Sequence, residues 1–214
     1  MYRDRLLDLK RDGQIRDILV SRRHTKPGVA VPIIRYSRVT AIPIVFDETR
    51  RELREAREYY QYKRRCLYCD ILRQEIGAEE RVVRLTPAFA ARGAVRAARA
   101  PRDVDRAAAA RGARSKRPSG LRTSATSPDS CPSYFRTLAR GFGDPGYEMV
   151  LHTAPNLRSR ILQGDWATIR DDYHWHIEIV PEPEHANRIG GIFINETRPE
   201  VSAAKLRQAW TDQV

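Results

Sequence analysis

The 214-residue chain lacks long apolar runs and has few cysteines. No stretch reaches the roughly 18 apolar residues that a membrane-spanning helix requires, and the first residues, Met1 to Arg5, provide no apolar signal core. We therefore expect a soluble, cytoplasmic protein with no membrane partner. Three cysteines do not make a disulfide framework, and the Cys66-x-x-Cys69 spacing more often indicates a metal site in a cytosolic chain.

Aromatic residues are missing from residues 90–120, where Val95 and Val104 are the only sizeable apolar side chains. Such a segment cannot supply a core. The formal net charge is +12, but residues 92–122 hold ten Lys/Arg against two Asp, and residues 21–38 hold five Lys/Arg and no acid. Because the positive charge belongs to two segments and not to a folded face, nucleic acid is not the favoured partner. A solvated linker and an RNA-binding arm are the alternatives for the Arg-rich segment.

The remaining regions have globular character, and 41% of all residues are hydrophobic. The patterns predict helices over residues 2–11, 48–63, 134–142 and 199–210. They predict strands over residues 15–20, 39–46, 81–85, 147–152, 173–181 and 193–195, and a loop over residues 153–170. Pro43 indicates a sheet edge or a strand end, and Asp47 fits a helix N-cap.

The predicted strand over residues 173–181 carries His174, His176 and Glu178 at alternate positions. Successive side chains of a strand point to opposite faces, so these three should share one face and the apolar residues between them the other. The first face suits metal or proton chemistry, and the second suits a core. An edge strand with a solvated polar face is the alternative.

Cys66 and Cys69 have the spacing of half a tetrahedral zinc site, whose other ligands would come from elsewhere in the chain. A pair of partly buried thiols, or a redox pair, is the alternative. Among the five histidines of the chain, His152, His174 and His176 are the strongest candidates. On the predicted charged helix, Glu48, Glu52 and Glu55 lie three or four residues apart and can share one face. Such an acidic face is usually solvated.

Several motifs follow one another in a specific order. They are Cys66-Leu67-Tyr68-Cys69-Asp70-Ile71, Leu151-His152-Thr153-Ala154-Pro155, Tyr173-His174-Trp175-His176-Ile177-Glu178-Ile179, Gly191-Ile192-Phe193-Ile194-Asn195 and Pro199-Glu200. Together they resemble the C-terminal half of galactose-1-phosphate uridylyltransferases, in the histidine triad superfamily. The resemblance covers residues 1–90 and 134–210. It implies an α/β (α+β) fold, with a histidine-triad-like antiparallel sheet, flanking helices and incomplete tandem domains.

The resemblance also implies nucleotidyl transfer from UDP-glucose to a hexose 1-phosphate through a uridylyl-histidine intermediate, in an enzyme that can form a homodimer. The nucleophile of the family lies in a His-Pro-His-Ser-Gln motif. Here Tyr36 occupies its position, Ser37 agrees with the motif and Arg38 replaces the glutamine, so these three are the candidate catalytic residues. A phenol lacks the leaving-group behaviour of an imidazole. The alternatives are therefore an inactive zinc-binding scaffold or partner subunit, and an Arg-rich RNA-binding protein.

The cofactors that the resemblance implies are zinc and, at a second site, iron, with a chiefly structural role. It assigns metal binding to six residues, namely Cys66, Cys69, His152, His174, His176 and, for the second site, Glu52. In some members the carboxylate that matches Glu52 joins a second metal site with histidines that match His152, His174 and His176. Plant-type members instead use the cysteine pair, a histidine from the middle of the domain and the histidine that matches His174. This sequence has no histidine between Cys69 and His152.

The resemblance divides the chain into two parts. Residues 1–62 match the end of the N-terminal transferase domain and a connecting helix, and residues 63–210 match the C-terminal histidine-triad-like domain. Residues 91–133 are predicted to be disordered or frame-shifted. Because the two basic segments coincide with the missing motif residues, we hypothesise two reading-frame slips in a GC-rich gene, which resequencing would test.

Overall fold

The computed structural model describes residues 2–26, 35–85, 90–93, 130–158, 166, 168–181, 188–189, 192–193 and 197–211. Most of the segment predicted to be disordered or frame-shifted, residues 94–129, lies outside the described residues, as does His185. None of the described helices is long and apolar enough to cross a membrane.

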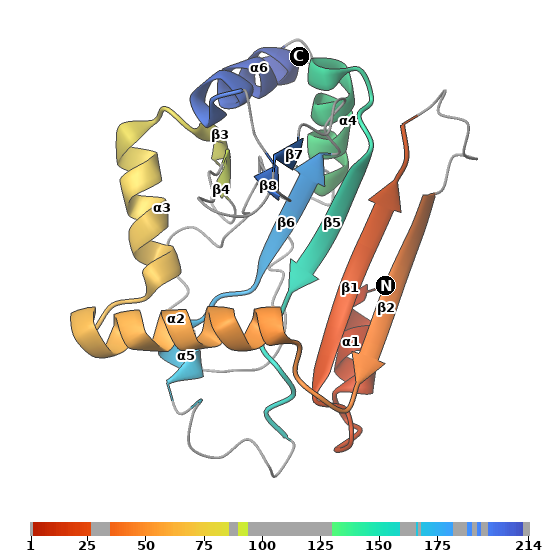
Figure 1. Cartoon of the computed structure of the whole chain (residues 1–214), viewed down its shortest axis with the longest axis vertical. Coiled ribbons are helices and arrows are strands. Elements are labelled where there is room, and N and C mark those ends of the chain that lie inside the picture. Colours follow the sequence, from red (N-terminus) through yellow and green to blue (C-terminus); the bar gives the residue numbers. More distant parts are fainter. Residues whose placement is uncertain are drawn as a thin grey trace.

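The centre of the molecule is a four-stranded antiparallel sheet with the order β2-β1-β5-β6 (Figure 1). Its strands are β1 (Asp17–His24), β2 (Arg35–Ile42), β5 (Tyr147–His152) and β6 (His176–Pro181). The predicted division between residues 62 and 63 separates strands that share this sheet. Two short hairpins accompany it, β3 (Val82–Leu85) with β4 (Ala90–Arg92), and β7 (Arg188–Ile189) with β8 (Ile192–Phe193).

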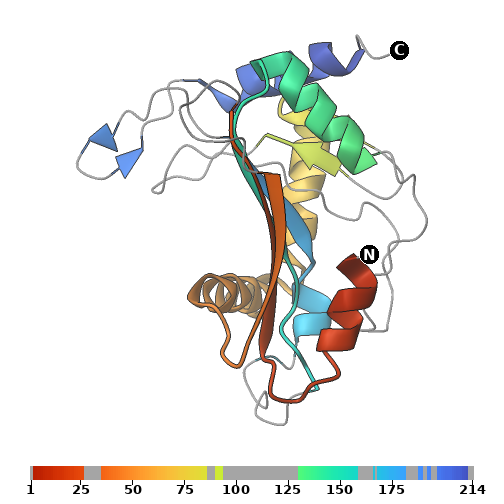
Figure 2. The ribbon, with the colours of Figure 1, turned by 90° about the vertical axis from the view of Figure 1, so that its right-hand side faces the viewer.

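Helices lie on both faces of the sheet, which confirms the predicted α/β fold with an antiparallel sheet flanked by helices. One face carries α1 (Tyr2–Leu9), α4 (Ser130–Phe142) and α6 (Pro199–Thr211), and the other carries α2 (Asp47–Lys63) (Figure 2). From the far end of α2 the chain turns into α3 (Leu67–Ala78), while α5 (Ile169–Asp172) packs against α2.

The core follows from the alternation of side chains along the strands. Met149, Leu151 and Ile179 point to the face of α1 and α4 and bury apolar surface, which is the main stabilising term of folding. Leu138 of α4 is 2% exposed and Leu6 of α1 is 3% exposed in these clusters. The opposite face of the same strands therefore remains available for polar residues.

The predicted elements differ from the observed ones chiefly at their ends. β2 begins earlier than predicted and stops at Ile42, because Pro43 has no backbone N–H to continue the ladder. Asp47 is the first residue of α2, and Phe46 occupies the N-cap position. The strand predicted from residue 173 begins only at His176.

Asp17, at the start of β1, anchors the residue that precedes α2. Its Oδ2 accepts a hydrogen bond from the Phe46 N–H at 3.2 Å, and its Oδ1 accepts one from the Ile18 N–H at 2.9 Å. A carboxylate at this end also complements the helix dipole. Asp17 is buried, and burial raises its pKa above the ordinary value despite these hydrogen bonds. β1 therefore fixes the start of α2, and Glu52 lies just over one turn further along.

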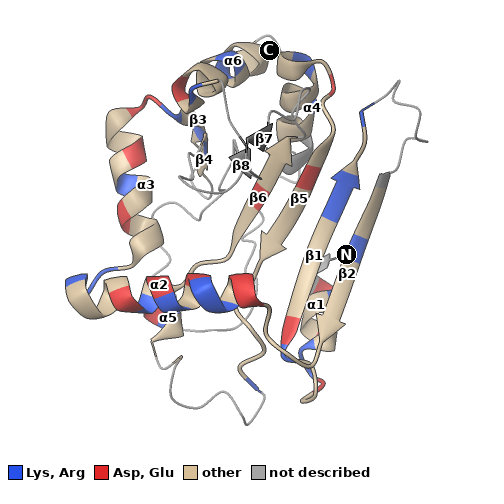
Figure 3. Cartoon of the chain, viewed as in Figure 1, with Lys and Arg blue, Asp and Glu red and all other residues tan. Residues whose placement is uncertain are grey.

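Charged residues are concentrated on α2 and α3, whereas β5 and β6 carry few (Figure 3).

The far end of α3 is held by a buried ionic cluster. Glu75 Oε1 lies 3.1 Å from Arg92 Nη1 and 2.7 Å from Arg81 Nη2, and only 4% of Glu75 is exposed. This cluster ties α3 to the β3–β4 hairpin.

Candidate metal centres

The structure sorts the predicted metal ligands into two separate clusters. The thiolate cluster consists of Cys66, Cys69 and His174. The carboxylate–imidazole cluster consists of Glu52, His152, His176 and Glu178, all of them buried. Within each cluster the candidate ligand atoms lie within 4.8 Å of one another.

The thiolate cluster is built by the start of α3 and the segment before β6. Cys66 is the N-cap residue of α3 and Cys69 lies in its first turn, so the helix spacing brings both sulfurs to one side. The Nδ1 atom of His174 lies 3.5 Å from Cys66 Sγ and 3.6 Å from Cys69 Sγ. Three donors therefore converge from residues more than 100 positions apart in the sequence.

The surroundings of the two thiols shift their pKa values in opposite directions. Hydrogen bonds from Cys66 and His174 lower the pKa of Cys69 to about 4, while the hydrogen bond to Cys69 and burial raise the pKa of Cys66. A bound cation deprotonates such a pair completely, since the thiolate is the ligand form. Two sulfurs and one imidazole fit zinc, which takes four ligands in structural sites. The described residues supply three of them.

The carboxylate–imidazole cluster lies between α2 and the polar face of the sheet. Glu52 Oε2 is 3.4 Å from His152 Nδ1, and Glu52 Oε1 is 3.6 Å from His176 Nε2. Glu178 Oε2 is 3.7 Å from His152 Nε2. The rings of His152 and His176 stack with centroids 4.7 Å apart. Two carboxylates and two imidazoles thus face one another in a buried space.

Hydrogen bonds from neighbouring groups orient His176 and Glu52 in the way that is common for metal ligands. The Nδ1 atom of His176 lies 3.1 Å from the His174 carbonyl, so it can donate there and leave Nε2 facing the cluster, an arrangement typical of metal-binding histidines. The hydroxyl of Tyr173 donates to Glu52 Oε2 at 3.3 Å. Burial alone would raise the pKa of Glu52, but the neighbouring imidazoles of His152 and His176 lower it below the ordinary value.

One buried atom tests whether a cation fits this cluster. Glu52 is 2% exposed, and its Oε1 atom accepts no hydrogen bond among the described residues. A buried carboxylate oxygen without a donor is costly, and a divalent cation would satisfy it together with the imidazole Nε2 of His176. Oxygen and imidazole donors suit iron or manganese better than a thiophilic ion. The donor set therefore fits the second metal.

Two of the interpretations of single residues prove wrong. His174 does not share a strand face with His176 and Glu178, because it precedes β6 and turns toward the cysteines. The solvated reading of the acidic helix face is wrong for Glu52, which is buried. His24 lies away from both clusters, where its Nε2 is 2.9 Å from Asp144 Oδ1.

The candidate catalytic residues Tyr36, Ser37 and Arg38 are exposed on the edge strand β2. Arg38 pairs with Ser21, Ser21 with Val150, and Val150 with Glu178, which places Arg38 and Glu178 in one row on the same sheet face. The row spans three strand spacings, about 14 Å. Tyr36 shares this face, with the Arg38 guanidinium 5.2 Å from its ring centroid, whereas Ser37 alternates to the opposite face.

Sequence reasoning missed two residues that build the site. Glu178 was placed on the correct face but not among the ligands, although its alternation with His176 was a usable signal. Tyr173 orients Glu52 through a hydrogen bond that only the fold creates.

No protein-family model matches the chain, and no curated protein matches it. Solved structures do. A uridylyltransferase superposes with a TM-score of 0.73 at 24% identity, over 99% of this chain and 66% of that one. A GALT-like protein from Arabidopsis thaliana superposes with a TM-score of 0.68 at 17% identity, over 97% of this chain and 66% of that one. An ADP-glucose phosphorylase from the same plant superposes with a TM-score of 0.65 at 16% identity, over 97% of this chain and 64% of that one.

The coverage is unequal on the two sides of these comparisons. Nearly all of this chain is matched, but it spans only about two thirds of the length of the structures that it resembles. The matches extend across both predicted parts of the chain, so the resemblance read from short motifs also holds for the three-dimensional arrangement. The chain therefore has the uridylyltransferase fold.

Proposed function

We propose that the chain binds a nucleotide sugar on the polar face of the sheet and transfers its nucleotidyl group, as a UDP-glucose:hexose-1-phosphate uridylyltransferase. The observation that carries the proposal is the row that joins Arg38 to Glu178, on a fold matched over 99% of the chain by a uridylyltransferase. One matched structure is an ADP-glucose phosphorylase with bound ADP-glucose, which supports a nucleotide sugar as ligand class.

Tyr36 is the residue that we assign to attack. Its phenolic oxygen would form a bond to the α-phosphorus of UDP-glucose, the bond to the β-phosphate oxygen would break, and glucose 1-phosphate would leave while the phenolic proton passes to solvent. The guanidinium of Arg38, beside the Tyr36 ring, would neutralise charge on the phosphoryl oxygens. A hexose 1-phosphate would then accept the uridylyl group. Ser37 belongs to the same motif, but its side chain lies on the opposite face of β2, so we assign the attack and the phosphoryl contact to Tyr36 and Arg38 alone.

The metal ions would have a structural role in this proposal. Bound zinc would supply cross-linking of the α3 start to the segment before β6, and Cys66, Cys69 and His174 would hold it. Glu52, which comes from α2, would join that helix to β5 and β6 through a second ion. Both clusters thereby support the sheet face on which the proposed chemistry takes place.

Incubation with UDP-glucose labelled at the α-phosphate tests the proposal. We expect a covalent adduct and one released glucose 1-phosphate per adduct. Tyr36→Phe should abolish the adduct, whereas Tyr62→Phe, which alters an exposed tyrosine of α2, should retain it. A phenolic phosphodiester survives acid, unlike a phosphoramidate on histidine, so acid treatment identifies the nucleophile. Wild-type protein that forms no adduct would contradict the assignment.

A second candidate function is an inactive zinc-binding scaffold or partner subunit. It is favoured by a specific observation, since a phenol stands at the nucleophile position while both metal clusters are assembled. Protein that retains metal through gel filtration but yields neither adduct nor glucose 1-phosphate would support this candidate. The same preparation thus separates the two functions.

A further inference from the structure

The two clusters share one short piece of chain. His174 belongs to the thiolate cluster and His176 to the carboxylate–imidazole cluster, with only Trp175 between them. The His174 carbonyl faces the Nδ1 of His176 at 3.1 Å, so the backbone of one ligand orients the ring of the other. Any shift of His174 toward or away from the sulfurs is therefore transmitted to His176.

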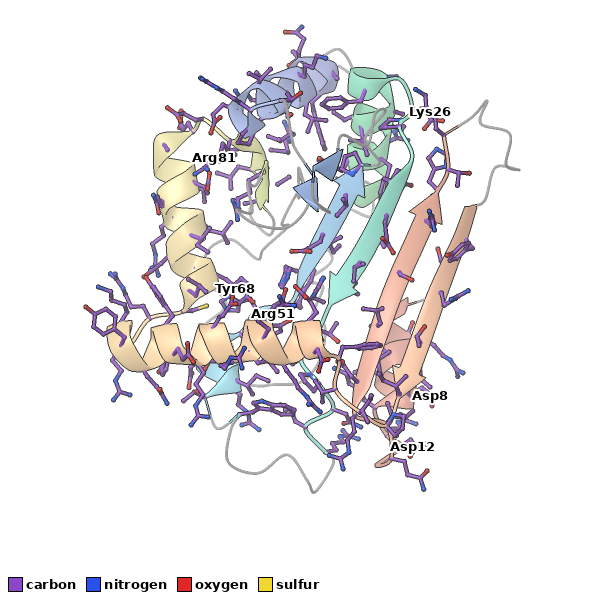
Figure 4. All side chains as sticks on the ribbon, viewed as in Figure 1. Asp8, Asp12, Lys26, Arg51, Tyr68 and Arg81 are labelled. Carbon is purple, nitrogen blue, oxygen red and sulfur yellow. The ribbon has the colours of Figure 1, made fainter. Side chains whose placement is uncertain are left out.

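Tyr68 provides a second connection, from within the cysteine turn. Its ring lies 5.2 Å from the His176 ring and 5.6 Å from the Tyr173 ring, the latter in an edge-to-face arrangement at 84°. Tyr173 in turn donates to Glu52. Figure 4 labels Tyr68 at the end of α3 that meets α2. The turn that carries both sulfurs thus packs directly on a ligand of the other cluster.

The charges of the donor sets permit both clusters to be filled together. Two thiolates balance one divalent ion at the first cluster, and the carboxylates of Glu52 and Glu178 balance one at the second. Each filled cluster is then close to neutral, so the Coulomb repulsion between the two sites is small. Because repulsion is small, the contacts of the His174 carbonyl and the Tyr68 ring with His176 determine whether one ion favours or opposes binding of the other.

We propose that the two clusters bind their metal ions cooperatively, because an ion in the thiolate cluster fixes the His174 carbonyl and the Tyr68 ring that orient His176. The first ion bears the entropic cost of ordering this shared segment, and the second ion binds to a site already arranged. Removing an outer contact of a metal ligand commonly changes metal affinity by roughly 10- to 100-fold. We expect a coupling of about tenfold, equal in both directions by linkage.

Cadmium and manganese probe the clusters separately, since Cd²⁺ prefers thiolates and Mn²⁺ prefers carboxylates. Metal-free protein is titrated with Mn²⁺, with free Mn²⁺ measured by electron paramagnetic resonance, before and after one equivalent of Cd²⁺ whose sulfur coordination is followed by ultraviolet absorption. We expect Cd²⁺ to tighten Mn²⁺ binding by about tenfold. Glu52→Gln should abolish Mn²⁺ binding, which assigns the manganese to the second cluster.

Two variants isolate the connection. Tyr68→Leu removes the ring but leaves the His174 carbonyl contact, so it should reduce the coupling while both ions still bind, whereas Tyr62→Leu changes an exposed tyrosine and should keep the full factor. Unchanged Mn²⁺ affinity of the wild-type protein with Cd²⁺ present would overturn the proposal, as would failure of either ion to bind its cluster. The readout involves no nucleotide, so it remains decisive even when no uridylyl adduct forms.

Discussion

Glu75 is a buried carboxylate whose removal should destabilise the protein strongly. It accepts from Arg92 and Arg81, and Arg92 is itself buried at 7% exposure. Glu75→Ala would remove the carboxylate that faces the buried Arg92 guanidinium, and breaking a buried ion pair typically costs about 3–5 kcal/mol. Because 29% of the Arg81 side chain reaches solvent and can be rehydrated, we expect the lower end, about 3 kcal/mol. The melting temperature should fall by about 6–12 °C.

Urea unfolding followed by circular dichroism measures this loss. The matched control is Gln74→Ala, an exposed neighbour on α3, which should change the free energy of unfolding by less than about 0.5 kcal/mol. A buried ion pair is poorly screened, so the difference between the two variants should persist at high salt. A Glu75→Ala loss below about 1 kcal/mol, or one that vanishes with salt, would refute the buried-pair reasoning.

Three further changes have defined outcomes. Burial raises the pKa of Asp17 above 3.8, so the folded state holds this proton more tightly than the unfolded chain, and the stability contributed by this group falls as the pH rises from about 4. Asp17→Asn should remove this decline, and parallel pH profiles of the two proteins would contradict it. Cys69→Ser should lose about one zinc per chain on dialysis, and full retention would argue against the thiolate cluster. Leu138→Ala should cost about 2–5 kcal/mol, whereas the exposed Leu157→Ala should cost little.

Much of the secondary structure could be predicted because local patterns determine it. The strand over residues 147–152 is observed with the predicted bounds, and the helix over residues 48–63 differs from α2 by one residue. Errors occur where a tertiary contact replaces a local signal. Asp47 was the expected N-cap, but Phe46 occupies that position, and its N–H donates to Asp17, 29 positions earlier in the chain.

The site could be predicted as a set of residue types but not as an arrangement. The His-x-His pattern and the cysteine pair indicated metal chemistry, and all six proposed ligands fall in one of the two clusters. The resemblance left His174 in either of two ligand sets, and the fold places it with the cysteines, because this depends on where β6 begins. His174 lies just outside β6, so strand alternation does not determine the direction of its side chain. The side chain turns toward the two cysteines.

The sequence by itself determined the chemistry available to this protein: a cysteine pair, a few histidines, a carboxylate-rich helix and a phenol at the position where the sequence resemblance predicts a nucleophile. These are properties of residue types and spacings, which alternation and helix periodicity convert into faces. Only the tertiary structure decided how those faces meet. Packing of α2 across the polar face of the sheet buried Glu52 beside His152 and His176, and cross-strand register placed Arg38 in the row of Glu178. Such contacts join segments about 100 residues apart, where no local pattern carries information.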